Sequence, residues 1–162
     1  MTATGAGPLY LLDTNVPIEL ARGRKMGQAI DTAYGVRAAG TAHLISAVTV
    51  GEVLGLAREF GWGASRTASV RTLLSAFVWV GINSSDVLEA YAELDQLNEP
   101  NGWNVGQNDL WIAATARVTG ATLLTSDKDF DPLEGTFLHR IWIDPSLGKP
   151  RTRSRHRVGR PS

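Results

Sequence analysis

The sequence predicts an α/β domain built on a parallel, doubly wound sheet of about five strands. Five short apolar runs alternate along the chain with six longer stretches of helical character, which is the arrangement expected of such folds. The first run is continuous rather than alternating, as in strands that are buried on both faces of a parallel sheet. We therefore expect helices on both faces of the sheet.

The expected elements follow one another at short intervals. The first strand is Leu9-Tyr10-Leu11-Leu12, and the other strands cover 43–47, 77–82, 122–125 and 139–143. The expected helices cover 16–22, 25–39, 50–60, 65–76, 86–98 and 109–119. Glycines stand where several of these elements are expected to stop, at positions 40, 61, 81 and 120.

The composition is that of a globular domain. The 162 residues are 43% apolar and 20% charged, enough for a sizeable core. No apolar run reaches the roughly 18 residues that span a bilayer, and the first residues lack a signal-peptide pattern. The absence of cysteine excludes disulfides and thiolate catalysis, and the three histidines are too scattered for a metal cluster. We expect a cytoplasmic protein that makes no membrane contact.

The charge is unevenly distributed. Six of the sixteen basic residues lie within 149–162, which contains no acid, so residues 1–148 hold sixteen acids and ten bases. We therefore divide the chain into a domain over 1–148 and a basic C-terminal tail over 149–162. The tail fits a disordered, solvated extension. It also fits an arm that binds phosphates, whose contacts would weaken steeply with salt.

Four carboxylates stand at the ends of expected strands or at the starts of expected helices: Asp13, Glu52, Asp109 and Asp127. In a parallel sheet with right-handed crossovers, every strand ends at the same edge. Asp13 and Asp127 would follow strands there, while Glu52 and Asp109 would open helices that leave this edge. We expect the four side chains to meet at one point.

Each acid also has a structural explanation. Asp13 fits an Asx turn after a strand, and Asp127 fits an ordinary turn. Glu52 lies three residues after Thr49, the spacing of a helix capping box. Asp109 suits the first turn of a helix, where a carboxylate is favoured by the helix dipole.

Taken together, the four acids indicate a divalent metal site. Asp109 shares a helical face with Ile112, Ala113 and Ala116, where loss of solvent would raise its pKa unless a cation offset it. Clustered carboxylates also repel one another. Mg²⁺ or Mn²⁺ relieves both problems, because hard cations prefer carboxylate and water oxygens.

Such a site suits the hydrolysis of phosphodiesters. One or two ions, about 3.5–4 Å apart if two bind, would activate a water and stabilise the leaving oxygen of an in-line displacement. Asp13 and Asp109 are the preferred direct ligands. Glu52 and Asp127 would ligate directly or through water, or position the attacking water. Two neighbours would orient carboxylates or contact phosphate, namely Asn15 and Thr125.

At these positions the chain resembles the PIN-domain family, in particular the VapC-like toxin ribonucleases of toxin–antitoxin pairs. Four segments carry the resemblance in the family's order: Tyr10-Leu11-Leu12-Asp13-Thr14-Asn15, Ile45-Ser46-Ala47-Val48-Thr49-Val50-Gly51-Glu52-Val53, Asn108-Asp109-Leu110-Trp111-Ile112-Ala113-Ala114 and Leu123-Leu124-Thr125-Ser126-Asp127-Lys128-Asp129-Phe130. The resemblance runs from about Leu9 to Asp144.

The resemblance implies a three-layer α/β/α domain and an acidic pocket that binds Mg²⁺ or Mn²⁺. It implies a metal-dependent endoribonuclease that is neutralised by a small antitoxin of the VapB type, and it implies a homodimer. The family's acids map onto the same four positions. Asp129 and Asp131 follow so closely that either could share the role given to Asp127.

Other residues allow two interpretations each. Trp103 precedes the Asp109 helix and suits either stacking on an RNA base or packing. Arg22, Arg24 and Lys25 suit either the rim of the pocket or a solvated surface. We assign the remaining tryptophans to core or dimer packing: Trp62, Trp79, Trp111 and Trp142.

Three other functions remain open on sequence grounds. One is a PIN-like nuclease that acts on structured DNA or in RNA processing. Another is a non-catalytic module that binds metal and nucleic acid. A phosphatase with Asp13 as nucleophile is less favoured, because such enzymes usually have a second acid two positions later, where Asn15 stands.

Overall fold

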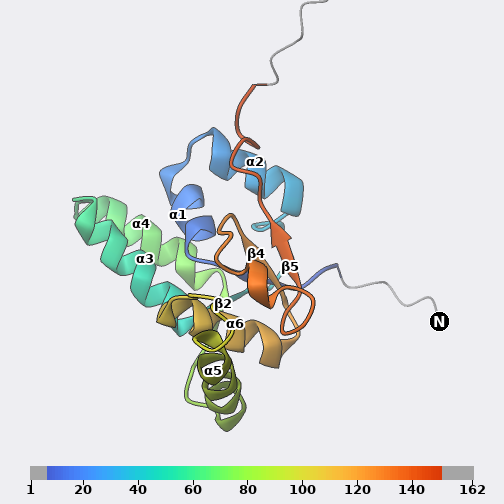
Figure 1. Ribbon diagram of the computed structural model, residues 1–162. Coiled ribbons are helices and arrows are strands. Elements are labelled where there is room, and N and C mark those ends of the chain that lie inside the picture. Colours follow the sequence, from blue (N-terminus) through green and yellow to red (C-terminus); the bar gives the residue numbers. More distant parts are fainter. Residues whose placement is uncertain (1–6, 151–162) are drawn as a thin grey trace, which may run out of the picture.

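The computed structural model describes residues 7–150 and shows a five-stranded parallel sheet between two layers of helices (Figure 1). The strands are β1 (Tyr10–Leu12), β2 (Leu44–Ser46), β3 (Val78–Val80), β4 (Thr122–Thr125) and β5 (Arg140–Trp142). Their order in the sheet is β3-β2-β1-β4-β5. The predicted α/β/α fold with a central parallel sheet is confirmed.

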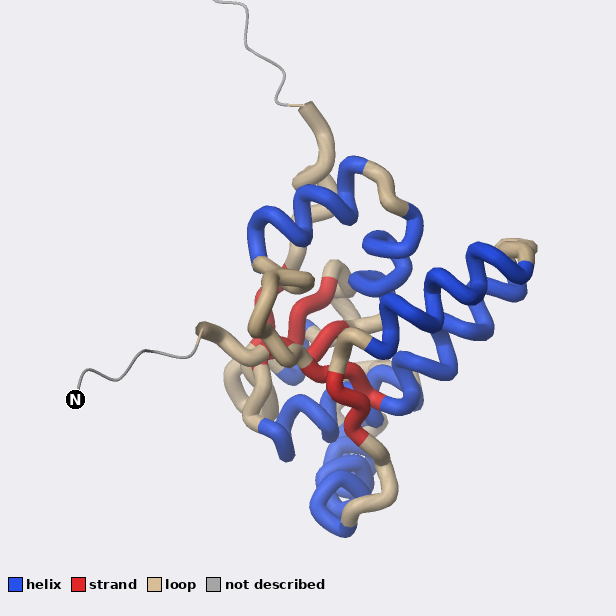
Figure 2. The backbone as a smooth tube through the Cα atoms, turned by 180° about the vertical axis from the view of Figure 1, so that it is seen from behind, coloured by secondary structure: helices blue, strands red, loops and turns tan. Residues whose placement is uncertain are grey.

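Over residues 7–150, six α-helices connect the strands: α1 (Asn15–Arg22), α2 (Lys25–Tyr34), α3 (Ala47–Glu59), α4 (Ala64–Ser75), α5 (Ser85–Asn98) and α6 (Gln107–Thr119). A short 3₁₀ helix, η1 (Asp131–Leu133), was not predicted. Seen from behind, the strands lie at the centre, with helices around them (Figure 2). Within residues 7–150, no helix combines the length and hydropathy that a membrane crossing needs.

The sheet divides the core into two halves. Tyr10 and Leu12 pack with the apolar residues of α1, α2, α3 and α4. Leu11 and Leu123 pack on the opposite face with α5 and α6. This alternation follows from the pleat of a strand, in which successive side chains point to opposite faces. Both faces of β1 are therefore buried, which explains its continuous apolar sequence.

Two predicted helix boundaries were wrong. The second helix ends at Tyr34 rather than at residue 39, because Gly35 takes a left-handed conformation and its N–H bonds to the Asp31 carbonyl. The third helix begins at Ala47 rather than at residue 50. Ser46 caps it by accepting a hydrogen bond from the Val48 N–H, so Glu52 lies inside the helix and a cap at Thr49 is excluded.

Two of the tryptophans assigned to core or dimer packing differ in their surroundings. Trp79 is 53% exposed on the edge strand β3, so of the two assignments, core or dimer packing, the core is excluded and dimer packing stays a prediction. Trp111 is half-buried and stacks on Tyr91, with ring centroids 3.7 Å apart.

The basic tail falls almost entirely outside the described residues, and both the proposed boundary at residue 149 and the tail's role stay predictions.

Helices α1 and α2 pack closely at Gly27. A Cβ atom at this position would lie 2.3 Å from the backbone oxygen of Glu19, which no side-chain rotation can relieve. Glu19 and Arg22 of α1 also line the pocket described below. The missing side chain at Gly27 therefore helps to hold the helix that forms one wall of that pocket.

We predict that Gly27→Ala destabilises the domain by about 1–3 kcal/mol, the usual cost of overpacking. Gly55→Ala is the matched control, because Gly55 is exposed within α3 and a Cβ there meets no atom within 4 Å. That variant should gain about 0.4–1 kcal/mol from a less flexible unfolded chain. Urea unfolding measures both; equal effects of the two substitutions would refute the close-packing argument.

Candidate metal centre

All four acids line one pocket of about 420 Å³ at the edge of the sheet where the strands end. Asp13 directly follows β1, and Asp127 lies two residues after β4. Glu52 projects from the second turn of α3, and Asp109 from the first turn of α6. Four segments that are distant in sequence therefore contribute one carboxylate each.

Asp13 is the most deeply buried of these acids, with 3% of its surface exposed. Its Oδ1 accepts a hydrogen bond from the Thr14 N–H at 2.8 Å. Its Oδ2 accepts bonds from the Thr125 hydroxyl at 2.6 Å and from Asn15 Nδ2 at 3.1 Å. The structure thus places Asn15 and Thr125 against Asp13, in positions to orient its carboxylate.

Asn15 and Thr125 also tie the β1 and β4 ends together. Asn15 Nδ2 lies 3.3 Å from Thr125 Oγ1, and Asn15 Oδ1 accepts the Ser126 N–H at 3.3 Å. Thr125 Oγ1 additionally accepts the Asp127 N–H at 2.9 Å. A single polar network therefore sets the spacing between Asp13 and Asp127.

Glu52 is held by two residues that were not among the predicted site residues. Its Oε1 accepts a hydrogen bond from the Thr14 hydroxyl at 2.7 Å, and its Oε2 accepts one from Asn108 Nδ2 at 3.1 Å. Asn108 lies in the first turn of α6, because the N-cap of this helix is Gly106. The sequence signal for both donors was their position, since each immediately adjoins one of the four acids.

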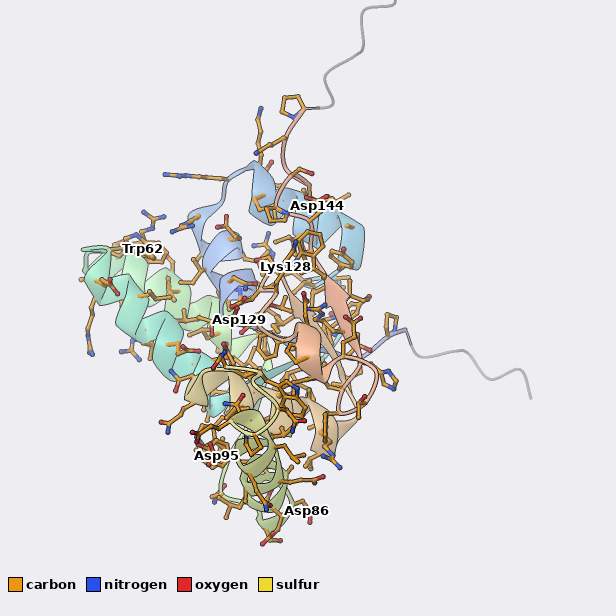
Figure 3. All side chains as sticks on the ribbon, viewed as in Figure 1. Trp62, Asp86, Asp95, Lys128, Asp129 and Asp144 are labelled. Atoms are coloured by element: carbon orange, nitrogen blue, oxygen red, sulfur yellow. The ribbon has the colours of Figure 1, made fainter. Side chains whose placement is uncertain are left out.

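Asp129 joins the group, whereas Asp131 does not. Asp109, Asp127 and Asp129 can each place one carboxylate oxygen within 4.8 Å of the others. Asp129 lies near the centre of the view in Figure 3. Neither Asp129 nor Asp131 is among the residues that line the pocket, and Asp131 forms an ion pair with Arg140 at 2.6 Å.

Burial and crowding raise the pKa of two of these acids. Loss of solvent raises the pKa of Asp13 to about 6 despite its hydrogen bonds, with smaller contributions from Asp127 and Glu52. Burial likewise raises the pKa of Asp109 to about 7, and the nearby charge of Asp13 is the next cause. The folded chain therefore holds carboxylates at neutral pH in a setting that disfavours their charge.

Strand β5 fixes the loop that carries Asp127 and Asp129. Arg140 has a 7% exposed side chain, and its Nη1 donates to the Asp127 carbonyl at 3.3 Å while its Nη2 pairs with Glu134 at 2.6 Å. Trp142 Nε1 donates to the Ser126 carbonyl at 3.0 Å. The sequence analysis missed Arg140, although a single arginine within an apolar strand was a visible signal.

The rim of the pocket is partly apolar. Ile18, Leu56 and Phe60 line it beside Arg22, whose Nη1 is paired with Glu19 at 2.7 Å. Arg24 and Lys25 are exposed at the start of α2 and are not among the lining residues. Of the three basic residues considered for the rim, only Arg22 is there.

Trp103 packs within the protein, as one of its two interpretations expected, and its stacking on an RNA base stays a prediction. It is half-buried and meets Phe137 edge-on, with ring centroids 5.6 Å apart, among the apolar residues of the α5–α6 half of the core.

Comparison with known proteins identifies the family. The sequence model of the PIN domain matches residues 10–135. A relative, the ribonuclease VapC4 of Mycobacterium tuberculosis (strain ATCC 25618 / H37Rv), is 39% identical over 88 residues, which is 53% of this chain and 67% of that protein.

Solved structures show the same fold. The VapBC2 structure from Rickettsia felis, bound to a DNA fragment from its promoter, matches with a TM-score of 0.71 at 22% identity, over 84% of this chain and 99% of that chain. A toxin–antitoxin complex from Klebsiella pneumoniae matches with a TM-score of 0.60 at 28% identity, over 78% and 93%. The chain therefore belongs to the PIN domain family and is VapC-like, as its four motifs indicated.

Proposed function

We propose that this chain is a divalent-metal-dependent endoribonuclease and the toxin of a VapBC-type pair. The observation that carries the proposal is the gathering of Asp13, Glu52, Asp109 and Asp127 in one pocket. A protein gains nothing in stability from four crowded carboxylates, two of them with raised pKa. The arrangement is explained if a cation occupies the pocket during catalysis.

The donor set fits Mg²⁺ or Mn²⁺. The pocket offers carboxylate oxygens, together with the hydroxyl and amide groups of Thr14 and Asn15. No cysteine exists in the chain, and no histidine lines the pocket. Oxygen-only surroundings favour hard divalent cations over zinc or copper. Mg²⁺ usually keeps several waters and takes only one or two carboxylates, so the remaining acids are free for other roles.

Asp13 and Asp109 are the proposed direct ligands, because burial makes their charges the most dependent on a counterion. Glu52 and Asp127 would complete the site directly or through water, or position the attacking water. Asn15 and Thr125 would keep the Asp13 carboxylate in a fixed orientation. Asp129 is close enough to Asp127 and Asp109 to share their role.

A bound divalent cation would supply activation of water and charge stabilisation for the leaving oxygen of an in-line phosphodiester displacement. This chain would contribute orientation, since the hydrogen bonds to Asp13 and Glu52 come from four residues on three separate segments. A rigid carboxylate frame avoids the cost of reorganisation during the reaction. No protein nucleophile is needed.

The proposed partners follow from the relatives. VapC4 is a ribonuclease, which supports RNA as the substrate. The Rickettsia and Klebsiella structures are toxin–antitoxin assemblies, which supports a small VapB-type antitoxin for this chain. A homodimer remains a prediction.

We predict that the purified chain cleaves total bacterial RNA into discrete fragments with Mg²⁺ and not with EDTA. Asp13→Asn should reduce cleavage by about 100-fold or more, since even residues that only orient metal ligands contribute about 10–100-fold. Thr125→Val, which removes one hydrogen bond to Asp13, should fall in that smaller range. Gel analysis and mapping of the new ends measure both. Full activity of a folded Asp13→Asn variant would rule out the assigned site, and cleavage of structured DNA instead would move the chain to another PIN-type function.

We also predict that the metal-free chain loses stability as pH rises from about 4 to 7. The folded-state pKa values of Asp13 and Asp109 lie above the ordinary 3.8, so the folded state retains protons that the unfolded state has released. Stability from these groups is complete below about pH 4 and is lost as pH passes through their folded pKa values.

Asp109→Asn tests this prediction. Because Asp109 is only half-buried, we expect the variant to gain no more than about 1 kcal/mol at pH 7, or roughly 2–4 °C in Tm. The gain should vanish near pH 4. Mg²⁺ should raise the Tm of the unaltered chain at pH 7 and have a smaller effect on the variant. A Tm that is independent of pH and of Mg²⁺ in both proteins would contradict the proposal.

A further inference from the structure

Two aromatic and two basic side chains form a continuous surface that begins at the rim of the acidic pocket. We call this surface the aromatic–arginine ridge; its members are Arg22, Phe60, Trp62 and Arg66. Arg22 and Phe60 line the pocket. Trp62 lies beyond them at the outer end of the α3–α4 hairpin, as Figure 3 shows, and Arg66 lies in the first turn of α4.

Cations and rings alternate along the ridge at contact distances. The Arg22 guanidinium carbon lies 5.1 Å from the centre of the Phe60 ring. Phe60 and Trp62 have ring centroids 5.5 Å apart. The Arg66 guanidinium carbon lies 4.0 Å from the centre of the Trp62 ring. The four side chains therefore form one connected row that leads away from the carboxylates.

The backbone holds the two aromatic residues in place. Gly61 turns the chain with a positive φ of 66°, and the Trp62 N–H bonds to the Ala57 carbonyl at 2.9 Å. The Trp62 carbonyl accepts the Thr67 hydroxyl at 3.1 Å. Phe60 nevertheless remains 41% exposed. The exposed part of the Phe60 ring is therefore accessible to a ligand at the rim of the pocket.

The charges on the ridge suit phosphate. Carboxylates repel a polyanion unless a cation offsets them, so cations that flank the pocket favour the approach of a nucleic acid. Arg22 is already paired with Glu19. Within residues 7–150, Arg66 forms none of the ion pairs seen in the structure, and it is exposed. Arg66 is therefore the cation on this surface that is free to meet a phosphate.

We propose that the aromatic–arginine ridge binds an unpaired stretch of the RNA next to the phosphate cleaved in the pocket. Bases would stack on the exposed Phe60 ring and on the Arg66 guanidinium that covers Trp62, and Arg66 would also contact phosphate. Stacking of this kind is open to single strands, whose bases are exposed, and closed to a duplex, whose bases face one another. The inference rests on the proposed ribonuclease function and adds a binding surface for RNA outside the carboxylate pocket.

Binding can be measured without cleavage. In the full chain carrying Asp109→Asn, we would follow the fluorescence anisotropy of a labelled, unstructured 12-nucleotide RNA and of the same sequence in a duplex. The single strand should bind more tightly. Phe60→Leu keeps an apolar side chain but removes the ring, and it should weaken single-strand binding roughly 5- to 100-fold. Phe60→Tyr keeps the ring and should retain the affinity.

Salt dependence tests the arginine separately. Arg66→Ala should reduce the slope of log Kd against log salt concentration by about 0.7, the value for one phosphate contact with a single strand. Arg71→Ala is the matched control, because Arg71 is exposed on the same helix and outside the ridge. Trp79→Ala is the control for removing an exposed aromatic ring elsewhere.

The outcomes separate this inference from the proposed function. If the unaltered chain cleaves RNA but Phe60→Leu and Arg66→Ala bind like their controls, the ridge proposal fails alone, and the ridge serves packing or a protein partner. Equal affinity for duplex and single strand also overturns it. If the unaltered chain binds RNA through the ridge but never cleaves it, the ribonuclease proposal fails. If both hold, Phe60→Leu should raise KM more than it lowers kcat, because the ring binds away from the reacting phosphate.

Discussion

The main constraint on this structure is that it holds four mutually repelling carboxylates in one pocket. Asp13, Glu52, Asp109 and Asp127 repel one another, and burial adds to the cost by raising the pKa of Asp13 to about 6 and that of Asp109 to about 7. On flexible segments, these carboxylates would move apart and so relieve the repulsion. The parallel sheet prevents this, because its strands are fixed by a core on both faces and all end at one edge.

Neutral hydrogen-bond donors hold the acids in place, while the charge on them is left for another partner. Asp13 and Glu52 receive their bonds from hydroxyl and amide groups of Thr14, Asn15, Asn108 and Thr125. Arg140 contacts the carbonyl of Asp127 in the loop after β4 and pairs with Asp131 and Glu134, neither of which lines the pocket. Arg22 lines the pocket, but its Nη1 pairs with Glu19. A permanent arginine partner for one of the four acids would have satisfied its charge and lowered its affinity for a cation. The arrangement therefore fixes geometry without neutralising the site.

The sequence was sufficient for the fold class and for the place of the four acids, because both depend on local patterns. Apolar runs mark buried strands, and parallel topology brings their ends to one edge. Boundaries were less predictable: the choice of Ser46 over Thr49 as helix cap depends on where β2 ends. An arginine within an apolar strand marks Arg140 as unusual, but its hydrogen bond to Asp127 could not be predicted. Nor could the contact between Arg66 and the Trp62 ring, because both depend on side-chain geometry that no sequence spacing encodes.

Mn²⁺ in crystals of the metal-free protein would test the central claim most directly, since its anomalous scattering locates the ion without reference to activity. We expect an anomalous peak inside the pocket, in contact with the carboxylates of Asp13 and Asp109, and its loss in crystals of Asp109→Asn. A pocket without a peak in millimolar Mn²⁺ near neutral pH would contradict the account. So would a peak found only at another hollow, between α5 and α6, whose lining includes Asp86, Glu89 and Glu93 together with Arg117.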